Sequence, residues 1–427
     1  MSGSADGHDS GSQDPPFEGY LKGDPRTKRV EIGLFLAGIA TFTLLYNTQA
    51  ILPYFSHEYD ITPSQAAMSV SAATAGLGLG LLAAVPVSER LGRVTLIRFS
   101  LLASTVLGIA TAFTDDWSLF LVSRFVMGFL LAGLPGTAAV YIKEEIHRSY
   151  STTATSIYIF GTTMGGLAGR IVAAGIIELV VLTGLDGVGG LGASNLAMLG
   201  TALLAAVCAG LCWALLPASR GFTPHRDSPA VLVRKFGRNL KDPVLVGLFL
   251  LGGLGMGTFV GTFNSLGYRL ESPPYLLSVG AVSLLYFVYP IAGYSSVVAG
   301  RAADRFSLRA VMPFGGLLGV VGVLTMALPH LAFIVVGMAV MAVGFFVMHS
   351  LASAWVAARS SVATGATAQA ASLYTLTYYV GSSISGNLTP LAWEGFGWPG
   401  VTTVGVGLMG TAFLISLLLR RSKPSAV

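Results

Sequence analysis

The hydrophobic residues of this chain gather in runs of about twenty, separated by short stretches that carry charge, proline or glycine. A helix of about 20 apolar residues spans the ~30 Å hydrocarbon layer of a membrane, so each run predicts a membrane-spanning helix. The predicted fold class is therefore an all-α membrane protein. The twelve predicted spans are 30–54, 64–88, 95–113, 118–141, 151–182, 194–217, 243–267, 276–299, 309–328, 331–355, 364–389 and 398–420.

Composition agrees with this pattern, since 53% of the 427 residues are hydrophobic and only 11% are charged. The net charge of +5 is compatible with a nucleic-acid partner, but the placement of the basic residues indicates a different origin. Twenty-one of the 25 Lys and Arg residues fall in the termini and in alternate loops, on the side that the positive-inside tendency makes cytoplasmic. Both termini are therefore predicted inside the cell, and no nucleic-acid partner is expected.

The longest polar stretch, residues 218–242, divides the spans into two sets of six. The predicted parts are a disordered cytoplasmic tail (1–29), an N-terminal six-helix bundle (30–217), a cytoplasmic linker (218–242), a C-terminal six-helix bundle (243–420) and a second cytoplasmic tail (421–427). Within the linker, residues 229–239 place apolar beside basic side chains. This segment suits a short helix at the membrane surface, or a solvated linker that carries positive charge.

A short charged motif occurs once in each half, "PVSERLGR" and "RAADRFSLR", each between the second and third span. Glu89 and Asp304 are 215 residues apart, as are Arg90 and Arg305. Since half of the chain has nearly this length, the sequence predicts two six-helix units in tandem.

These loops resemble the signature of the major facilitator superfamily, Gly-x-x-x-Asp-Arg-x-Gly-Arg. The first copy has Val85 and Glu89 in place of Gly and Asp, and the second has Ser307 and Leu308 in place of Gly-Arg. The resemblance covers residues 30–420 and implies twelve helices in two pseudo-symmetric bundles. It also implies a cytoplasmic gate, for which the candidate residues are Glu89, Arg90, Gly92, Arg93, Glu144, Gly300, Asp304 and Arg305.

Four further stretches, "YNTQAILP", "GGLAGR", "GTFVGTFNSLGYRL" and "LYTLTYYVGSSISG", resemble the YnfM-like, drug-efflux-type branch of bacterial inner-membrane transporters. Antiporters of that type carry Gly-x-x-x-Gly-Pro-x-x-Gly-Gly in the fifth span, where this chain has Gly166 for Pro and Arg170 for the last Gly. Glycines at every fourth position predict close helix packing, with the hypothesis that such ridges slide as the halves rock. The ridge glycines are Gly161, Gly165, Gly169, Gly253, Gly257 and Gly261.

Arg124 and Arg170 lie within predicted spans, where a charge costs about 2.5–3.5 kcal/mol or more and usually serves a function. Arg124 resembles the buried Arg of the family's fourth-span motif, which is associated with proton coupling. Either guanidinium suits a carboxylate or phosphate of a substrate. Alternatively, it lowers the pKa of a nearby acid that exchanges protons, for which Glu31 and Glu178 are candidates. The alternative for Arg124 and Arg170 is a structural role, snorkelling to the interface or binding backbone carbonyls.

Polar and aromatic residues complete a predicted cavity between the halves. Gln49 and Asn264 are 215 residues apart, which places an amide at equivalent depth in the first and seventh spans. His349 is a titratable group within the tenth span. The candidates for substrate binding or proton coupling are Arg124, Arg170, Tyr46, Asn47, Gln49, Asn264, Tyr289, Tyr378, Tyr379 and His349. No catalytic residue is assigned. No metal ligand is assigned either, since Cys208 and Cys212 are interpreted as small buried apolar residues.

The sequence contains no HExxH, no GxSxG and no Gly-Lys pair, so it has no Walker A phosphate loop. An enzyme is not expected, and the proton gradient takes the place of a cofactor as the energy source. The predicted function is proton-coupled efflux of small amphipathic molecules or drugs by a monomeric secondary active transporter in a bacterial cytoplasmic membrane, working by alternating access in contact with the lipid bilayer. The alternative is a carrier of an organic anion or lipid-like substrate bound through Arg124 and Arg170. A non-transporting receptor or scaffold would leave both arginines and the repeated loops unexplained.

Overall fold

The computed structural model describes residues 17–184, 190–222 and 228–422, and the regular elements within them are helices plus one isolated bridge. The all-α prediction is thus confirmed for these residues. The N-terminal half contains α1 (Pro25–Tyr46), η1 (Gln49–Ile51), α2 (Leu52–Glu58), α3 (Pro63–Leu91), α4 (Arg93–Thr111), α5 (Trp117–Leu131), α6 (Ala138–Glu145), α7 (Arg148–Thr183) and α8 (Ala193–Leu215). The C-terminal half follows α9 (Pro229–Leu240) and contains α10 (Pro243–Glu271), α11 (Val279–Leu284), η3 (Leu285–Phe287), α12 (Val288–Phe306), α13 (Leu308–Met326), α14 (Leu331–Ala363) and α15 (Thr367–Arg420).

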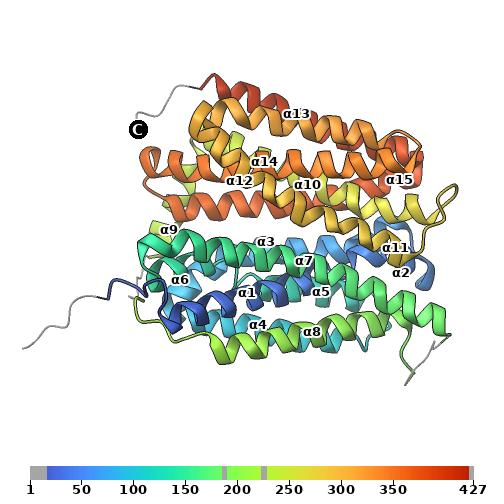
Figure 1. Cartoon of the computed structure of the whole chain (residues 1–427), viewed down its shortest axis with the longest axis horizontal. Coiled ribbons are helices and arrows are strands. Elements are labelled where there is room, and N and C mark those ends of the chain that lie inside the picture. Colours follow the sequence, from blue (N-terminus) through green and yellow to red (C-terminus); the bar gives the residue numbers. More distant parts are fainter. Residues whose placement is uncertain (1–16, 185–189, 223–227, 423–427) are drawn as a thin grey trace, which may run out of the picture.

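Figure 1 shows the two halves as two layers of roughly parallel rods, blue to green and yellow to red. The first and last described residues lie at the same end of the molecule as α6 and α9, on the left of the view. The short helices α2 and α11 lie at the opposite end. This arrangement agrees with loops that alternate between two faces of a membrane.

Ten helices of the described residues are long and apolar enough to cross a membrane. One of them, α15, has 54 residues and consists of two legs that meet at Gly397, whose φ of 61° and ψ of −151° are not helical. The predicted spans 364–389 and 398–420 lie on these two legs. The predicted span 118–141 is shared by α5, with 15 residues, and α6. The number of twelve spans and their direction in the membrane stay predictions.

The segment before α1 differs from the predicted disordered tail. The helix begins at Pro25, where the side chain of Asp24 accepts a hydrogen bond from Arg26 N at 2.7 Å. Tyr20 forms the isolated bridge with Ile146, because its N–H donates to Glu145 O at 2.7 Å. The expectation of disorder through residue 29 is therefore wrong for residues 20–29, and residues 1–16 lie outside the described part.

The internal repeat is visible in the backbone of the two signature loops. Gly92 joins α3 to α4 with φ 90° and ψ 151°, and Ser307 joins α12 to α13 with φ 82° and ψ 149°. This region of positive φ is essentially restricted to glycine. The glycine of the loop signature is thus explained by the turn, and Ser307 adopts the same turn in spite of its side chain.

The predicted linker helix is present as α9, whose two ends are tied differently. Ser228 caps its amino end by accepting a hydrogen bond from Val231 N. Near its carboxyl end, Asn239 is fully buried, donates to Ala366 O at 3.1 Å and accepts from Thr364 Oγ1 at 2.6 Å. Since these partners lie in the turn between α14 and α15, α9 is attached to the C-terminal half and is not a free linker.

Candidate functional site

Arg170 of α7 lies at the junction of the two halves, with only 2% of its surface exposed. Its Nε donates to Gln49 Oε1 at 2.8 Å, its Nη2 donates to the same oxygen, and its Nη1 donates to Gly166 O at 2.5 Å. Within the described residues, no carboxylate lies within 4 Å of this guanidinium. Arg170 is therefore held in place by neutral groups, which leave its positive charge unneutralised.

Three tyrosine rings surround the same guanidinium. Its central carbon lies 4.5 Å from the ring centre of Tyr46, 4.7 Å from that of Tyr289 and 5.0 Å from that of Tyr286. These distances are typical of cation–π attraction, which strengthens when water is excluded. Tyr46 belongs to the N-terminal half and the other two to the C-terminal half, so both halves contribute to the enclosure of Arg170.

A chain of amides continues from Arg170 into the C-terminal half. Gln49 Nε2 donates to Asn264 Oδ1 at 2.6 Å, and Asn264 Nδ2 donates to Gly386 O at 2.8 Å. Gln49 lies in η1, where the helical stretch is interrupted between α1 and α2, and Pro53, four residues on, has no N–H to donate to the Gln49 carbonyl. The sequence predicted amides at equivalent depth, and the structure brings them into direct contact.

Arg124 of α5 has an exposed fraction of 0% and a different environment. It donates to Leu44 O at 2.7 Å, Leu45 O at 2.8 Å, Asn47 Oδ1 at 3.1 Å and Ser69 O at 2.9 Å. Two of these acceptors are unpaired carbonyls at the carboxyl end of α1, where a positive charge also interacts favourably with the helix dipole. This is the backbone-binding alternative that the sequence left open, and it ties α1, α3 and α5 together.

Asn47 follows Tyr46 in the chain, but its side chain makes contacts within the N-terminal half. Its Oδ1 accepts from Arg124 and its Nδ2 donates to Thr201 Oγ1 of α8 at 2.9 Å. Both ends of this amide are thus occupied within the N-terminal half. Of the first-span candidates, Tyr46 and Gln49 face Arg170, whereas Asn47 faces Arg124.

His349 of α14 lies in an aromatic cluster of the C-terminal half. Its Nδ1 is 2.8 Å from the hydroxyl of Tyr374, and its ring centre is 4.8 Å from that of Tyr378 and 5.6 Å from that of Phe345. Tyr378 in turn packs edge-on against Tyr379 at 5.1 Å. Ring contacts through Phe345, Phe259 and Tyr289 link this cluster with the rings around Arg170. The sequence does not distinguish the two phenylalanines, since apolar aromatic residues are common in membrane spans.

Comparison with known proteins places the chain in a family. Residues 34–386 match the sequence profile of the Major Facilitator Superfamily. The chain is 34% identical over 413 residues to the Inner membrane transport protein YnfM of Escherichia coli (strain K12), an alignment that covers 97% of this chain and 95% of that protein. The chain belongs to the Major Facilitator Superfamily. It is also 34% identical to the Uncharacterized MFS-type transporter YybF of Bacillus subtilis (strain 168), with 93% of this chain and 94% of that protein covered.

Solved structures support the superfamily fold. The bacterial homolog of the human lysosomal transporter Spinster, in its inward-facing and unoccupied conformation, matches with a TM-score of 0.73 at 15% identity, over 94% of this chain and 100% of that chain. A point mutant of the nucleoside transporter NupG matches with a TM-score of 0.71 at 14% identity, over 91% and 99% of the two chains. These two matches show the fold, while the family profile and the sequence relatives show that the chain is a membrane transporter of this superfamily and not an enzyme.

The superfamily's loop signature has different surroundings in the two halves. In the N-terminal half, Arg93 forms an ion pair with Glu144 at 3.0 Å and donates to Ser88 Oγ at 2.6 Å. In the last turn of α3, Glu89 is half-buried and Arg90 is exposed. These contacts lie within one half, where they join α4 to α6.

The second copy of the signature is open to its surroundings. Asp304 and Arg305 at the end of α12 are exposed, and the Arg305 guanidinium lies 5.3 Å from the ring centre of Phe306. Gly300 has no atom near the place that a Cβ would take. Whether these residues close a cytoplasmic gate stays a prediction for both copies.

The glycine ridges pack helices within each half. A Cβ on Gly165 would lie 2.6 Å from Ile39 O and one on Gly169 would lie 2.6 Å from Thr43 O, both on α1. The ridge Gly253, Gly257 and Gly261 of α10 faces α15 in the same way. Each ridge and its partner belong to the same half, so the ridges lie inside the bundles and not at their boundary. The hypothesis that they slide as the halves rock stays a prediction.

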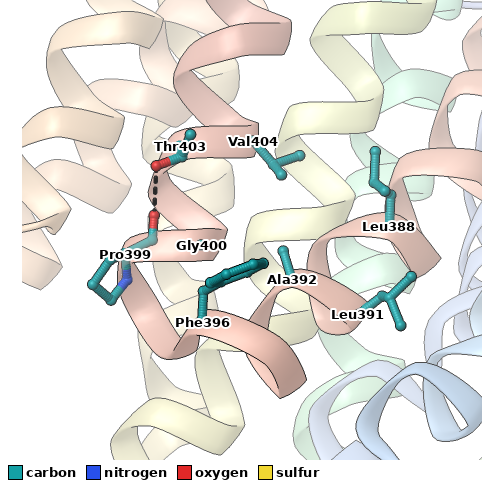
Figure 2. A pocket seen from close by; sticks show the side chains of 8 residues that line it. All are labelled: Leu388, Leu391, Ala392, Phe396, Pro399, Gly400, Thr403 and Val404. Atoms are coloured by element: carbon teal, nitrogen blue, oxygen red, sulfur yellow. Dashed lines mark hydrogen bonds between the residues drawn. The ribbon is translucent and has the colours of Figure 1, made fainter.

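Two surface hollows differ in composition and position. The one in Figure 2, about 550 Å³, surrounds the junction of the two α15 legs and is lined by apolar side chains such as Leu391 and Phe396. It shares no residue with the environment of Arg170. A second groove, about 480 Å³, lies between α3 and α5 of one half and α15 of the other.

The second groove combines apolar and polar groups. Its apolar wall includes Met68, Val122 and Phe125, and it also contains Ser71 and Asn387. The buried oxygens Ser71 Oγ and Asn387 Oδ1 have no hydrogen-bond partner among the described residues. A Cβ on Gly386 would lie 3.2 Å from Ser71 Oγ and 3.3 Å from Asn264 Nδ2, so the polar part of the groove lies beside the amide chain that leads to Arg170. Sequence reasoning missed both residues because single Ser and Asn side chains are common in spans.

Described residues include no cluster of His, Cys, Asp or Glu that could hold a metal ion. Cys208 and Cys212 are buried and carry free thiols, in agreement with their interpretation as small packing residues.

Proposed function

We propose that this chain is a secondary active transporter that works by alternating access in the cytoplasmic membrane of a bacterium and exports small amphipathic molecules in exchange for protons. The observation that carries the proposal is the enclosure of Arg170 by groups from both halves. Tyr46 and Gln49 come from one half, and Tyr289 and Asn264 from the other. A site built in this way is taken apart when the halves rock, and it then opens first to one side of the membrane and later to the other.

The chemistry of the site supports an amphipathic substrate. Tyrosine and phenylalanine faces offer apolar contact, while the amides of Gln49 and Asn264 and the hydroxyl of Tyr289 offer hydrogen bonds. The Tyr289 hydroxyl is buried without a partner among the described residues, so it is available to a bound molecule. The mostly apolar groove that contains Asn387 supports entry from the bilayer.

Proton exchange needs a titratable group whose surroundings change during the cycle. His349 is a candidate because its ring stacks on those of Phe345 and Tyr374 and its Nδ1 lies 2.8 Å from the Tyr374 hydroxyl. Glu178 is a second candidate, since it lies at the contact between α7 and α11. The proton gradient is the proposed energy source.

A second candidate function is transport of an organic anion, and one specific observation favours it. The buried guanidinium of Arg170 has two remaining N–H groups and no carboxylate partner among the described residues. A planar carboxylate would supply the missing negative charge through paired hydrogen bonds. Arg124 is less suited to this role because its donors already bind four protein oxygens.

Flux measurements in proteoliposomes test both candidates. The probes are ethidium as an aromatic cation, benzyl alcohol as a neutral aromatic and benzoate as an aromatic carboxylate, each with and without an imposed pH gradient. We expect ethidium flux that accelerates when protons flow in the opposite direction and is absent with Arg170→Ala protein. Benzoate flux that depends on Arg170, without ethidium flux, favours the anion carrier. Flux that ignores the gradient contradicts proton exchange.

A further inference from the structure

Two glutamates reach from one half of the molecule to the other at the end opposite the described termini. Glu178 of α7 accepts a hydrogen bond through Oε2 from Gly280 N of α11 at 3.1 Å. Glu394 of α15 accepts through Oε1 from Ser64 N of α3 at 2.6 Å. The first contact runs from the N-terminal to the C-terminal half, and the second runs the opposite way.

The two contacts are copies of one another in the internal repeat. Glu394 follows Glu178 by 216 positions, and Gly280 follows Ser64 by the same number. The residues that cap the receiving helices, Thr62 and Ser278, are also 216 positions apart. One geometry is therefore built twice, with donor and acceptor exchanged between the halves.

Each carboxylate binds a backbone N–H that the helix itself leaves free. In α3, the Thr62 hydroxyl accepts a hydrogen bond from the N–H of the third helical residue. The N–H of Ser64, the second helical residue, donates to Glu394 instead. The same holds for α11, the first part of the helical stretch Val279–Phe306. The Ser278 hydroxyl accepts from the N–H of the third helical residue, and the N–H of Gly280, the second, donates to Glu178. A negative charge at a helix amino end is also attracted by the helix dipole.

Other contacts join the halves at the same end. The hydroxyls of Ser56 and Tyr268 are 2.7 Å apart, and a Cβ on Gly267 would lie 2.9 Å from Pro53. These contacts lie next to α2 and α11, which Figure 1 places at the end remote from α6 and α9. The two glutamate contacts are therefore part of a set of direct contacts between the halves at this end of the molecule.

We propose that Glu178 and Glu394 form a two-part latch that holds the halves together at this end, so that they are positioning residues of the transport cycle. The inference rests on the alternating access proposed above. Opening of this end breaks both carboxylate contacts at once. Because of the repeat, each half supplies one glutamate and one backbone N–H to the latch. Removal of either glutamate shifts the protein toward the state that is open at this end.

The test measures distance between the halves and needs no substrate. Cys208 and Cys212 are replaced by alanine, and spin labels are attached at His57→Cys on α2 and Ala327→Cys after α13, both exposed positions. Pulsed electron paramagnetic resonance on the full chain in lipid nanodiscs then reports the populations of short and long distances. The variants are Glu178→Ala, Glu394→Ala, the double Ala variant, Glu178→Gln, which keeps an acceptor oxygen without charge, and Glu178→Asp, which keeps the charge with a shorter reach.

We expect each Ala substitution to raise the ratio of long to short distances by about two- to fivefold, and the double variant by about tenfold. Glu178→Gln and Glu178→Asp give smaller increases than Glu178→Ala. Glu58→Ala is the matched control, because Glu58 lies at the same end and its carboxylate lies beside Gly192 of its own half; it leaves the ratio unchanged.

An unchanged ratio in the double Ala variant, with correctly folded protein by size-exclusion chromatography, overturns the latch. An equal change in Glu58→Ala overturns it as well, since loss of any nearby charge would then suffice. Should Glu178→Ala fail to fold, Glu178→Gln and Glu394→Ala carry the test. A changed ratio without flux of any probe supports the latch and contradicts the proposed function. Flux with an unchanged ratio supports the proposed function and contradicts the latch.

Discussion

Gln49 Nε2 and Asn264 Oδ1 are 2.6 Å apart, so two amides at corresponding positions of the two halves are bonded directly to one another. The same Gln49 accepts from Arg170 through its Oε1, which makes its side chain the connection between the charged site and the C-terminal half. The orientation of the Gln49 amide is thereby determined, since its oxygen faces the guanidinium and its nitrogen faces Asn264.

A double-mutant cycle measures this connection. We expect Gln49→Leu and Asn264→Leu to show a coupling of about 0.6 kcal/mol, and at most about 1.7 kcal/mol, in chemical unfolding of the protein in detergent. Strictly additive effects of the two substitutions would contradict a direct bond. Thr41→Val and Asn264→Leu form the control pair, because Thr41 lies on α1 and its hydroxyl makes no hydrogen bond within the described structure.

Arg170→Lys is expected to reduce transport by about tenfold or more while leaving the amount of folded protein unchanged. Lysine keeps the positive charge, but its single ammonium lacks the fork that holds Gln49 Oε1 with two N–H groups. Initial rates in proteoliposomes provide the measurement. Arg98→Lys is the control, since Arg98 binds Trp213 O and Leu216 O at the end of α8; full activity of Arg170→Lys would reduce the role of Arg170 to that of a charge.

Arg124→Ala is expected to lower stability, by roughly 2 kcal/mol or more, because it leaves the carbonyls of Leu44, Leu45 and Ser69 without their donor. The resemblance of the sequence implied a role for Arg124 in proton coupling, whereas these contacts predict a lower midpoint of thermal unfolding for Arg124→Ala. The unfolding midpoint of Arg124→Lys should lie between those of Arg124→Ala and the wild type. An unfolding midpoint equal to that of the wild type, together with lost transport, would restore the direct role in transport.

Ser307→Gly is expected to stabilise the protein by about 1 kcal/mol, because φ 82° and ψ 149° strain any residue with a Cβ. The reciprocal change Gly92→Ser places a side chain in the equivalent turn and should cost about 1–3 kcal/mol. Thermal unfolding followed by fluorescence measures both. Opposite signs for the two substitutions are the expected result, and equal signs would argue against a shared turn.

Gly165→Val is expected to destabilise the N-terminal half by about 1–3 kcal/mol, since even a Cβ at this position would lie 2.6 Å from Ile39 O. Gly175 on the same helix is the matched control, because a Cβ there meets no atom within 4 Å. Gly175→Val should therefore leave the unfolding midpoint close to that of the wild type. Similar losses in both variants would point to a general effect of valine in α7.

The repeat was readable from the sequence at several of these positions. The offset of 215 connects Gln49 with Asn264, and Glu89 with Asp304, because duplicated units keep the order of their residues even where the contacts differ. The same reasoning did not find Ser64, Gly280 and Glu394, since a serine, a glycine and a glutamate near loops carry no signal until their backbone partners are known. Glu178 was a sequence candidate for proton exchange only, and its contact with the other half became visible in the structure.

The sequence by itself determined the class of the protein, the position of the apolar helices and the presence of two buried arginines, because hydrophobic run length and charge placement are local properties of the chain. Only the tertiary structure decided what the arginines do. Arg124 and Arg170 are both arginines within spans, yet one binds the carbonyls at the end of α1 and the other faces tyrosines of both halves. The difference arises from which helices pack beside them, and packing depends on contacts between residues far apart in the sequence.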